Sequence, residues 1–218
     1  EQGQQIMERA VITEGLVLLG WRDVPVDNTT IGVTARSVEP VIKQIFVGAG
    51  ADIKDQLAFE RRLYCVRKRT AWGVRRAGLN DNNENFYACS LSSKTLIYKG
   101  QLMAPQLETY YLDLKDPDMV SALALAHSRY STNTFPSWGR AQPFRYIAHN
   151  GEINTVRGNQ NWMRARESMF ESPLFKDINM ILPVIAPGGS DSADFDQALE
   201  MLFLTGRSLA HSMMMMIP

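Results

Sequence analysis

The segment YIAHNGEINTVRGN, residues 146–159, carries residue types that can stabilise a developing negative charge. Asn150 offers a side-chain amide and Gly151 offers a backbone N–H, and both donors can converge on one oxygen atom. Such a pair forms an oxyanion hole for acyl transfer, in which glycine lets the chain approach closely and adopt a positive φ. Asn-Gly between two β-prone runs also predicts a hairpin. The residues leave both interpretations open, because a tight turn would present both donors.

Two charged residues could hold the ends of a free α-amino acid. Arg129, in HSRYSTNTF (127–135), follows an apolar run, and its planar guanidinium best matches a carboxylate. Asp191, in GGSDSADFDQALEML (188–202), could bind the ammonium group of the amino acid whose carboxylate Arg129 holds. The structural alternatives are a salt bridge for Arg129 and helix capping by Ser190 or Asp191, with Asp194 in the first turn. The residues alone do not choose between binding and structure.

Acyl transfer also requires a nucleophile, and the chain has two cysteines. Cys89, in FYACSLSS (86–93), alternates along an expected strand and is interpreted as a small buried hydrophobic residue. Cys65 lies on a basic helix whose charge could lower its pKa, but no histidine is near it in sequence. The sequence therefore predicts a polar pocket without an obvious attacking group.

Composition narrows the classes of partner. Lys plus Arg and Asp plus Glu both number 23, and this neutral balance argues against nucleic-acid and membrane-surface binding. The basic run at 61–76 is interpreted as the solvated face of a helix. The spacing of the histidines and cysteines matches no zinc site, so we expect no metal. The two cysteines form no disulfide framework, which is typical of a reducing, cytoplasmic setting. No apolar run reaches the ~20 residues of a membrane span, and no signal peptide is evident.

Periodicity predicts a single α+β domain over residues 1–218. Strands cluster in the middle of the chain with helices on both sides in sequence, which favours α+β layers over alternating βαβ units. Helices are expected at 4–16, 52–69, 155–170 and 190–206, and strands at 16–26 (broken by Gly20), 40–50, 86–93, 95–102 and 107–114, with 122–132 either helix or strand.

The run from His127 to Glu167, followed by SDSADFDQALE, resembles the class II glutamine amidotransferase domain of the glutamate synthase large subunit. The resemblance covers essentially the whole chain, including GWRDVPVD (20–27) and FYACSLSSKTLIYKG (86–100). It implies the N-terminal-nucleophile (Ntn) hydrolase fold, an αββα sandwich of two antiparallel sheets covered by helices. It also implies a cysteine at the mature N-terminus, whose thiolate attacks the side-chain amide of L-glutamine while its α-amino group serves as base.

The resemblance assigns roles to six residues. Arg129 corresponds to the clamp on the glutamine α-carboxylate, and Asp191 corresponds to the partner of the α-ammonium group. Asn150 and Gly151 correspond to the oxyanion hole. Thr132 and Asn133 are expected to line the substrate pocket.

One departure from the family pattern concerns the nucleophile. The chain starts at Glu1, and neither cysteine lies in the family's N-terminal context, so we expect an internal fragment that does not hydrolyse glutamine alone. In full-length enzymes of this type, ammonia passes to further synthase domains of the same chain and combines with 2-oxoglutarate. FMN and a 3Fe-4S cluster carry the electrons, from NADPH through a small electron-transfer subunit or from ferredoxin. None of the binding sites for FMN, the 3Fe-4S cluster or 2-oxoglutarate falls within these residues. The terminal sequence MMMMIP favours the NADPH-dependent enzymes over the ferredoxin-dependent ones.

Two other functions compete with this one. The chain could be a non-catalytic module that binds glutamine or glutamate through Arg129 and Asp191. It could also be a class II amidotransferase with another ammonia acceptor, as in glucosamine-phosphate, purine or asparagine synthesis. The motifs STNTFPSW (131–138) and HNGEINT (149–155) argue against an amidotransferase with another ammonia acceptor.

Overall fold

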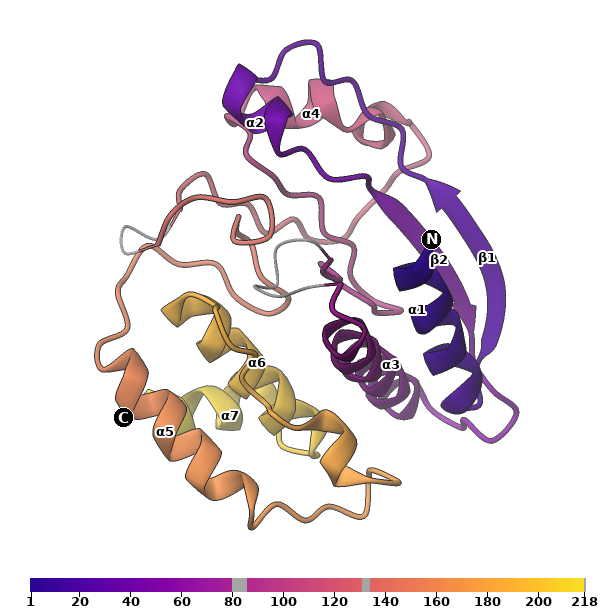
Figure 1. Ribbon diagram of the computed structural model, residues 1–218, viewed down its shortest axis with the longest axis vertical. Helices are drawn as coiled ribbons and strands as arrows, with labels where there is room; N and C mark the ends of the chain where they lie inside the picture. Colours follow the sequence, from indigo (N-terminus) through magenta and orange to yellow (C-terminus); the bar gives the residue numbers. More distant parts are fainter. Residues whose placement is uncertain (80–85, 131–133, 218) are drawn as a thin grey trace.

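The computed structural model describes residues 1–79, 86–130 and 134–217, and helices predominate in it (Figure 1). The α-helices are α1 (Gln2–Thr13), α2 (Val33–Ser37), α3 (Gln56–Arg76), α4 (Gln106–Tyr110), α5 (Val156–Glu167), α6 (Asp191–Leu204) and α7 (Leu209–Met216). Two 3-10 helices are η1 (Leu112–Lys115) and η2 (Ile178–Ile181), and the strands are β1 (Val17–Asp23) and β2 (Lys43–Gly48).

β1 and β2 pair as an antiparallel hairpin, with Trp21 opposite Ile45. The register shifts between Leu18 and Gly20, and Gly20 has φ +144°, which side chains rarely allow. A strand is therefore confirmed at this place, but the predicted break is wrong: β1 runs without interruption from Val17 to Asp23, and Gly20 lies at an irregularity of the pairing.

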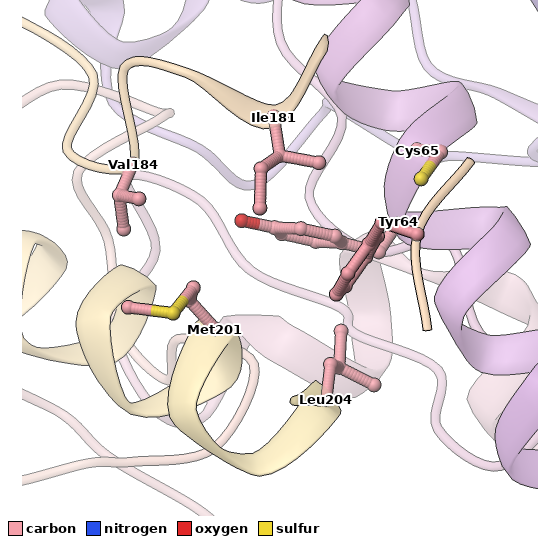
Figure 2. Packing of buried hydrophobic residues seen from close by; sticks show 7 residues of the cluster. Tyr64, Cys65, Ile181, Val184, Met201 and Leu204 are labelled. Atoms are coloured by element: carbon pink, nitrogen blue, oxygen red, sulfur yellow. The ribbon is translucent and has the colours of Figure 1, made fainter. Parts of the chain in front are cut away.

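α3 is the central element, because its two sides bury different neighbours (Figure 1). Leu63 and Val66 pack with α1 and the hairpin. Tyr64 and Cys65 pack against η2 and α6 in the cluster that Figure 2 shows, together with Ile181, Val184, Met201 and Leu204. Asp55 caps the start of the helix by accepting a hydrogen bond from the Ala58 N–H at 2.7 Å. Because its two sides pack against different neighbours, α3 joins the N-terminal hairpin to the C-terminal helices.

A third cluster of buried side chains connects α2 to α4. Tyr110 and Tyr111 pack in it with Trp138, whose indole N–H donates to the Ala35 carbonyl oxygen at 3.0 Å. This aromatic group fixes residue 138, and with it the start of the segment that leads to Asn150.

The basic run on α3 is not a solvated face, so that interpretation is wrong. Arg67 is buried and pairs with Glu200 of α6. Arg69 pairs with the buried Glu14, and the Lys68 ammonium donates to two backbone carbonyl oxygens. Contacts inside the molecule therefore take up several of the positive charges of this run.

The strands expected between 86 and 114 are not formed. Residues 86–102 have no ladder partner among the described residues, and their backbone groups bond to side chains instead. Glu60 accepts the Ser93 N–H at 2.7 Å, and the Tyr111 hydroxyl donates to the Lys99 carbonyl oxygen at 2.7 Å. Residues 107–114 fold mostly as α4 and η1, with one isolated bridge from Tyr111 to Val26.

The mixture of helices and sheet agrees with the expected α+β class, whereas the second sheet of the sandwich is not seen. Among the described residues the only sheet has two strands. Residues 122–130 form neither helix nor strand, although both were allowed by their pattern. None of the described helices has the length and apolar character needed to cross a membrane.

Candidate functional site

His127 brings the segment of Arg129 to the segment of Asn150. The backbone N–H of Arg129 donates to His127 Nδ1 at 3.1 Å, which requires that nitrogen to be unprotonated. Nε2 therefore carries the proton. It lies 2.8 Å from Asn150 Oδ1 and 3.0 Å from the His149 carbonyl oxygen, and it donates to them. A neutral imidazole thus connects the two motifs.

This contact decides which end of the Asn150 amide is available. Oδ1 accepts from His127, so the amide's two N–H bonds point away from the imidazole. The residue is exposed, and its Nδ2 has no hydrogen-bond partner among the described residues. Gly151 is exposed beside it. Both residues expected to form the oxyanion hole are therefore exposed.

The predicted hairpin at Asn150-Gly151 is wrong, and so is the positive φ expected of Gly151. Residues 143–155 contain no strand, and Gly151 is not among the glycines with positive φ. The nearest backbone turn bond runs from the Phe144 N–H to the Ile147 carbonyl oxygen at 2.9 Å. Side chains take the place of a ladder: the Gln142 amide exchanges two hydrogen bonds with the His149 backbone, at 3.0 and 3.1 Å.

Asp196 of α6 anchors the start of the same segment. Its fully buried carboxylate accepts the backbone N–H groups of Arg145, Tyr146 and Ile147, at 3.2, 2.7 and 3.3 Å. Burial raises the pKa of this carboxyl group, although the Arg145 charge and these N–H bonds act in the opposite direction. One helix side chain thus sets the course of the chain toward Asn150.

Asp191 begins α6 and also reaches this segment. Ser190 caps the helix by accepting the Ala193 N–H at 3.2 Å, as predicted. Asp191 Oδ1 accepts the Ser192 N–H at 2.7 Å, while Oδ2 accepts the Ile153 N–H at 2.8 Å. The carboxylate keeps lone-pair capacity on Oδ2 for a further donor.

The predicted binding residues do not share one pocket. Asp191 and Ile153 line a cavity of about 690 Å³ between α5, α6 and α7, and neither Arg129, Asn150 nor Gly151 lines it. The Arg129 side chain is exposed and makes no hydrogen bond or ion pair with another described residue. Thr132 and Asn133 lie outside the described residues.

Neither cysteine has the surroundings of a nucleophile. Burial, and next the Glu14 charge, raise the pKa of Cys65 to about 12, so the idea that basic neighbours lower it is wrong. Cys89 is half-buried in irregular chain rather than on a strand. No three His, Cys, Asp or Glu side chains of the described residues lie together as metal ligands would.

Sequence reasoning missed His127, Asp196 and Gln142, which position the 142–153 segment. His127 had a visible signal, since it lies two residues before Arg129 in an apolar-to-polar transition. Asp196 gave none, because its spacing in α6 equals that of a solvent-facing residue.

The amino-acid sequence matches one protein family and several curated proteins. The model of a family described as "Glutamine amidotransferases class-II" matches residues 1–218. The chain is 53% identical over 207 residues to "Glutamate synthase [NADPH] large chain" of Bacillus subtilis, covering 94% of this chain and 13% of that protein. It is 48% identical over 222 residues to "Glutamate synthase [NADH]" of Saccharomyces cerevisiae, covering 99% and 10%. It is 43% identical over 220 residues to "Ferredoxin-dependent glutamate synthase, chloroplastic" of Oryza sativa, covering 100% and 13%.

The chain therefore spans only about a tenth to a seventh of the length of these curated relatives. The family match, by contrast, extends over every residue of the chain. This chain belongs to the class II glutamine amidotransferases.

Proposed function

We propose that these residues are the glutaminase part of a glutamate synthase, binding L-glutamine and stabilising the oxyanion formed when its side-chain amide is attacked. The observation that carries this proposal is the contact of His127 Nε2 with Asn150 Oδ1 at 2.8 Å. It joins the two motifs and leaves the Asn150 Nδ2 without a hydrogen-bond partner among the described residues, next in sequence to the exposed Gly151. Preorganised donors of this kind act where negative charge develops in acyl transfer.

Each residue then has a separate task. Arg129 receives the α-carboxylate of glutamine, and Asp191 receives the α-ammonium group through Oδ2. The thiolate of an N-terminal cysteine attacks the amide carbon, and Asn150 and Gly151 donate to the resulting oxyanion. Ammonia then leaves as a glutamyl thioester forms, and water hydrolyses the thioester to glutamate. That cysteine would precede Glu1, because neither Cys65 nor Cys89 suits the role.

The same proposal includes the αββα sandwich. Residues 86–102 are β-prone and extended but lack a ladder partner among the described residues. A strand needs a neighbouring strand to satisfy its backbone groups. We propose that strands contributed by a longer chain complete the two antiparallel sheets around this segment.

For the whole protein, we propose that the released ammonia supplies reductive amination of 2-oxoglutarate in further domains. Those domains, with a small electron-transfer subunit, would hold FMN and a 3Fe-4S cluster. An iron–sulfur cluster needs several cysteine thiolates, and no group of three or more potential metal ligands occurs among the described residues. Relatives named for NADPH or NADH are 44–53% identical and those named for ferredoxin 40–43%, which supports the NADPH type. A cytoplasmic location belongs to the same proposal.

Calorimetry with L-glutamine and glutaminase assays test the proposal. A longer chain with an N-terminal cysteine ahead of Glu1 should release ammonia from glutamine, whereas the 218 residues alone should not. Arg129→Ala should raise KM for glutamine. Turnover by the 218 residues that Cys89→Ala abolishes would contradict the missing nucleophile.

The non-catalytic binding module remains the second candidate, because neither Cys65 nor Cys89 has the surroundings of a nucleophile. It predicts glutamine binding by the 218 residues and no ammonia release from the longer chain. The other ammonia acceptors are less well supported, because the relatives named above are all glutamate synthases.

A further inference from the structure

A small cavity between α3, residues 86–99 and the start of α6 is lined by basic side chains. Its volume is about 170 Å³, and no Asp or Glu is among the described residues that line it. The cations lining it are Arg67, Lys68, Lys99, Arg140 and Arg145. Such an accumulation of one charge in a partly enclosed space favours an ion of opposite sign.

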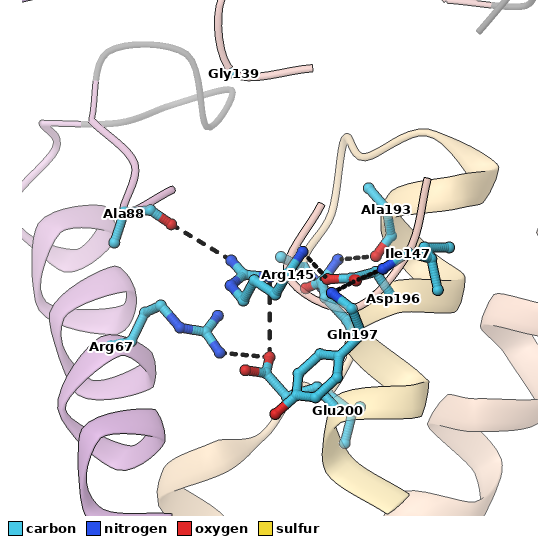
Figure 3. A network of polar contacts seen from close by, with 12 residues as sticks. Arg67, Ala88, Gly139, Arg145, Ile147, Ala193, Asp196, Gln197 and Glu200 are labelled. Atoms are coloured by element: carbon cyan, nitrogen blue, oxygen red, sulfur yellow. Dashed lines mark hydrogen bonds and ion pairs between the residues drawn. The ribbon is translucent and has the colours of Figure 1, made fainter. Parts of the chain in front are cut away.

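Arg67 and Arg145 pair with carboxylates, yet each retains an unused donor. Figure 3 shows Arg67 paired with Glu200, and Arg145 between Asp196 at 3.4 Å and Glu200 at 3.9 Å. Both Nε atoms are buried and have no hydrogen-bond partner among the described residues. A buried guanidinium N–H without an acceptor costs free energy, so an acceptor at this place would stabilise the chain.

Lys99 has no ion pair with a carboxylate of the described residues. It is 7% exposed, and within the described part of the chain its ammonium makes one hydrogen bond, to the Gly139 carbonyl oxygen at 2.8 Å. The rings of Phe144 and Tyr87 lie 5.2 and 5.9 Å away. Three N–H donors need three acceptors, and burial lowers the pKa of this ammonium group. The charge is therefore only partly compensated among the described residues.

Lys68 adds a second ammonium without a carboxylate partner. Its Nζ donates to the carbonyl oxygens of Pro183 and Val184, at 2.5 and 3.0 Å. Burial, and next the Arg67 charge, lower the pKa of Lys68 to about 7. A bound anion would oppose both effects.

We propose that this cavity binds a small oxyanion, a phosphate or a carboxylate, held by the Lys99 ammonium in the positive field of the Arg67 and Arg145 side chains that line it. Oxyanions accept the charge-assisted hydrogen bonds that these donors lack. The volume is below that of pockets for drug-sized ligands, so the occupant is a small ion. Arg129, Asn150 and Asp191 do not line the cavity, so this inference is independent of the proposed glutaminase role.

Calorimetric titration of the 218-residue chain with inorganic phosphate, and separately with acetate, tests the site at constant ionic strength. Saturable binding of either ion is expected. Binding of phosphate alone would identify a phosphate site, and binding of acetate a carboxylate site. Lys99→Met should weaken binding about ten- to a hundredfold, the effect of losing one hydrogen bond to a charged group. The matched control is Lys94→Met, which removes an exposed ammonium and should change the affinity by less than about twofold.

A second variant keeps the proposal testable if the Lys99→Met chain fails to fold. Gln197 lines the cavity, accepts the Ala186 N–H at 2.9 Å and donates to the Ala193 carbonyl oxygen. Gln197→Glu keeps the shape and the acceptor while placing a carboxylate among the cations. It should raise the melting temperature and weaken phosphate and acetate binding about tenfold or more. Failure of both ions to bind the unaltered chain, or equal binding by a folded Gln197→Glu chain, would overturn the site.

Discussion

The His127 imidazole is the residue that connects substrate binding to the proposed oxyanion hole. Its Nδ1 accepts from the Arg129 backbone, and its Nε2 donates to Asn150 Oδ1. An amide held by its oxygen presents its nitrogen in a defined direction, whereas a free asparagine would sample several rotamers. In the proposed oxyanion hole, the orientation of Asn150 would therefore depend on His127, a neighbour with no proposed contact to the substrate.

Asn150→Ala should lower the glutaminase kcat of a longer chain with an N-terminal cysteine by about 10²–10³-fold, the usual effect of losing one oxyanion donor. Steady-state assays of ammonia release measure it. Asn154→Ala is the matched control, because Asn154 is exposed in the same segment and its side chain makes no hydrogen bond with a described residue. A near-normal rate for Asn150→Ala would remove Asn150 from the site.

His127→Ala should lower kcat in the same longer chain about ten- to a hundredfold, since a misplaced Asn150 amide loses its geometry. KM for glutamine should change little, because the imidazole orients the oxyanion donor rather than the substrate. His127→Gln places an N–H near the position of Nε2 and should recover most of kcat. Equal losses in both variants, or a loss confined to KM, would show that His127 has only a structural role.

At this scale the sequence predicts residue types better than their arrangement. Asn150, Gly151 and Asp191 could be selected because amides, glycine and helix-start carboxylates have characteristic chemistry. Their contacts could not be predicted, because His127 meets Asn150 across 23 positions of sequence and no periodicity relates them. The hairpin prediction failed for the same reason, since side chains of Gln142 and Asp191 supply the bonds that a ladder would have made.

Among the elements, α6 does most to shape the proposed site. Asp196 fixes residues 145–147, and Asp191 fixes Ile153, so one helix holds the segment on both sides of Asn150. The helix itself was predicted from its cap and apolar spacing. Its inward-facing carboxylates were not, because polar residues in a helix are normally assigned to its solvent face.

Asp196→Asn should reduce the free energy of unfolding of the 218-residue chain by about 3–5 kcal/mol, because it removes the fully buried carboxylate that pairs with Arg145 and accepts three backbone N–H groups. Urea denaturation followed by circular dichroism measures the loss. Asp23→Asn is the control: Asp23 pairs with Lys43 at the surface and should cost at most about 1 kcal/mol. Similar small losses in both variants would mean that Asp196 does not anchor the segment.

The position of Cys65 on α3 predicts its chemical behaviour. A thiol that is buried, with a pKa of about 12, is almost entirely protonated at pH 8, whereas the half-buried Cys89 is more accessible. A disulfide reagent such as Ellman's should therefore modify Cys89 in the native chain and both thiols after denaturation. Cys89→Ser should abolish the native reaction and Cys65→Ser should leave it. Rapid modification of Cys65 in the folded Cys89→Ser chain would contradict this prediction.

Helices and strands could be predicted where contacts between residues close in sequence stabilise them. The helices α1, α3, α5 and α6 and the β1–β2 hairpin were predicted near their observed positions, because apolar spacing and caps act over a few residues. The middle of the chain was not, since a β-prone run becomes a strand only beside another strand. Residues 107–114 show this plainly: their tyrosines pack around Trp138 from α4 and η1 rather than from a sheet.

Over the whole molecule, buried charge makes stability depend on pH. Burial raises the pKa of Asp194 to about 6 from 3.8; the Gln160 hydrogen bond opposes this and the Asp191 charge adds to it. Between about pH 4 and pH 6 the folded state therefore keeps a proton that the unfolded state has lost. Because the folded state binds more protons in this window, its stability falls as the pH rises through it.

Asp194→Asn should consequently be more stable than the unaltered chain at pH 7, by about 1–3 kcal/mol for a shift of roughly two pKa units. The amide oxygen still accepts from Gln160, and the penalty of a buried charge disappears. The advantage should shrink as the pH falls from about 6 to 4, because Asp194 is then protonated in the unaltered chain as well. Urea denaturation at pH 4, 5, 6 and 7 measures the difference, with the exposed Asp118→Asn as a control that should show no such trend. An Asp194→Asn chain whose difference in stability stays constant from pH 4 to 7 would show that Asp194 ionises normally.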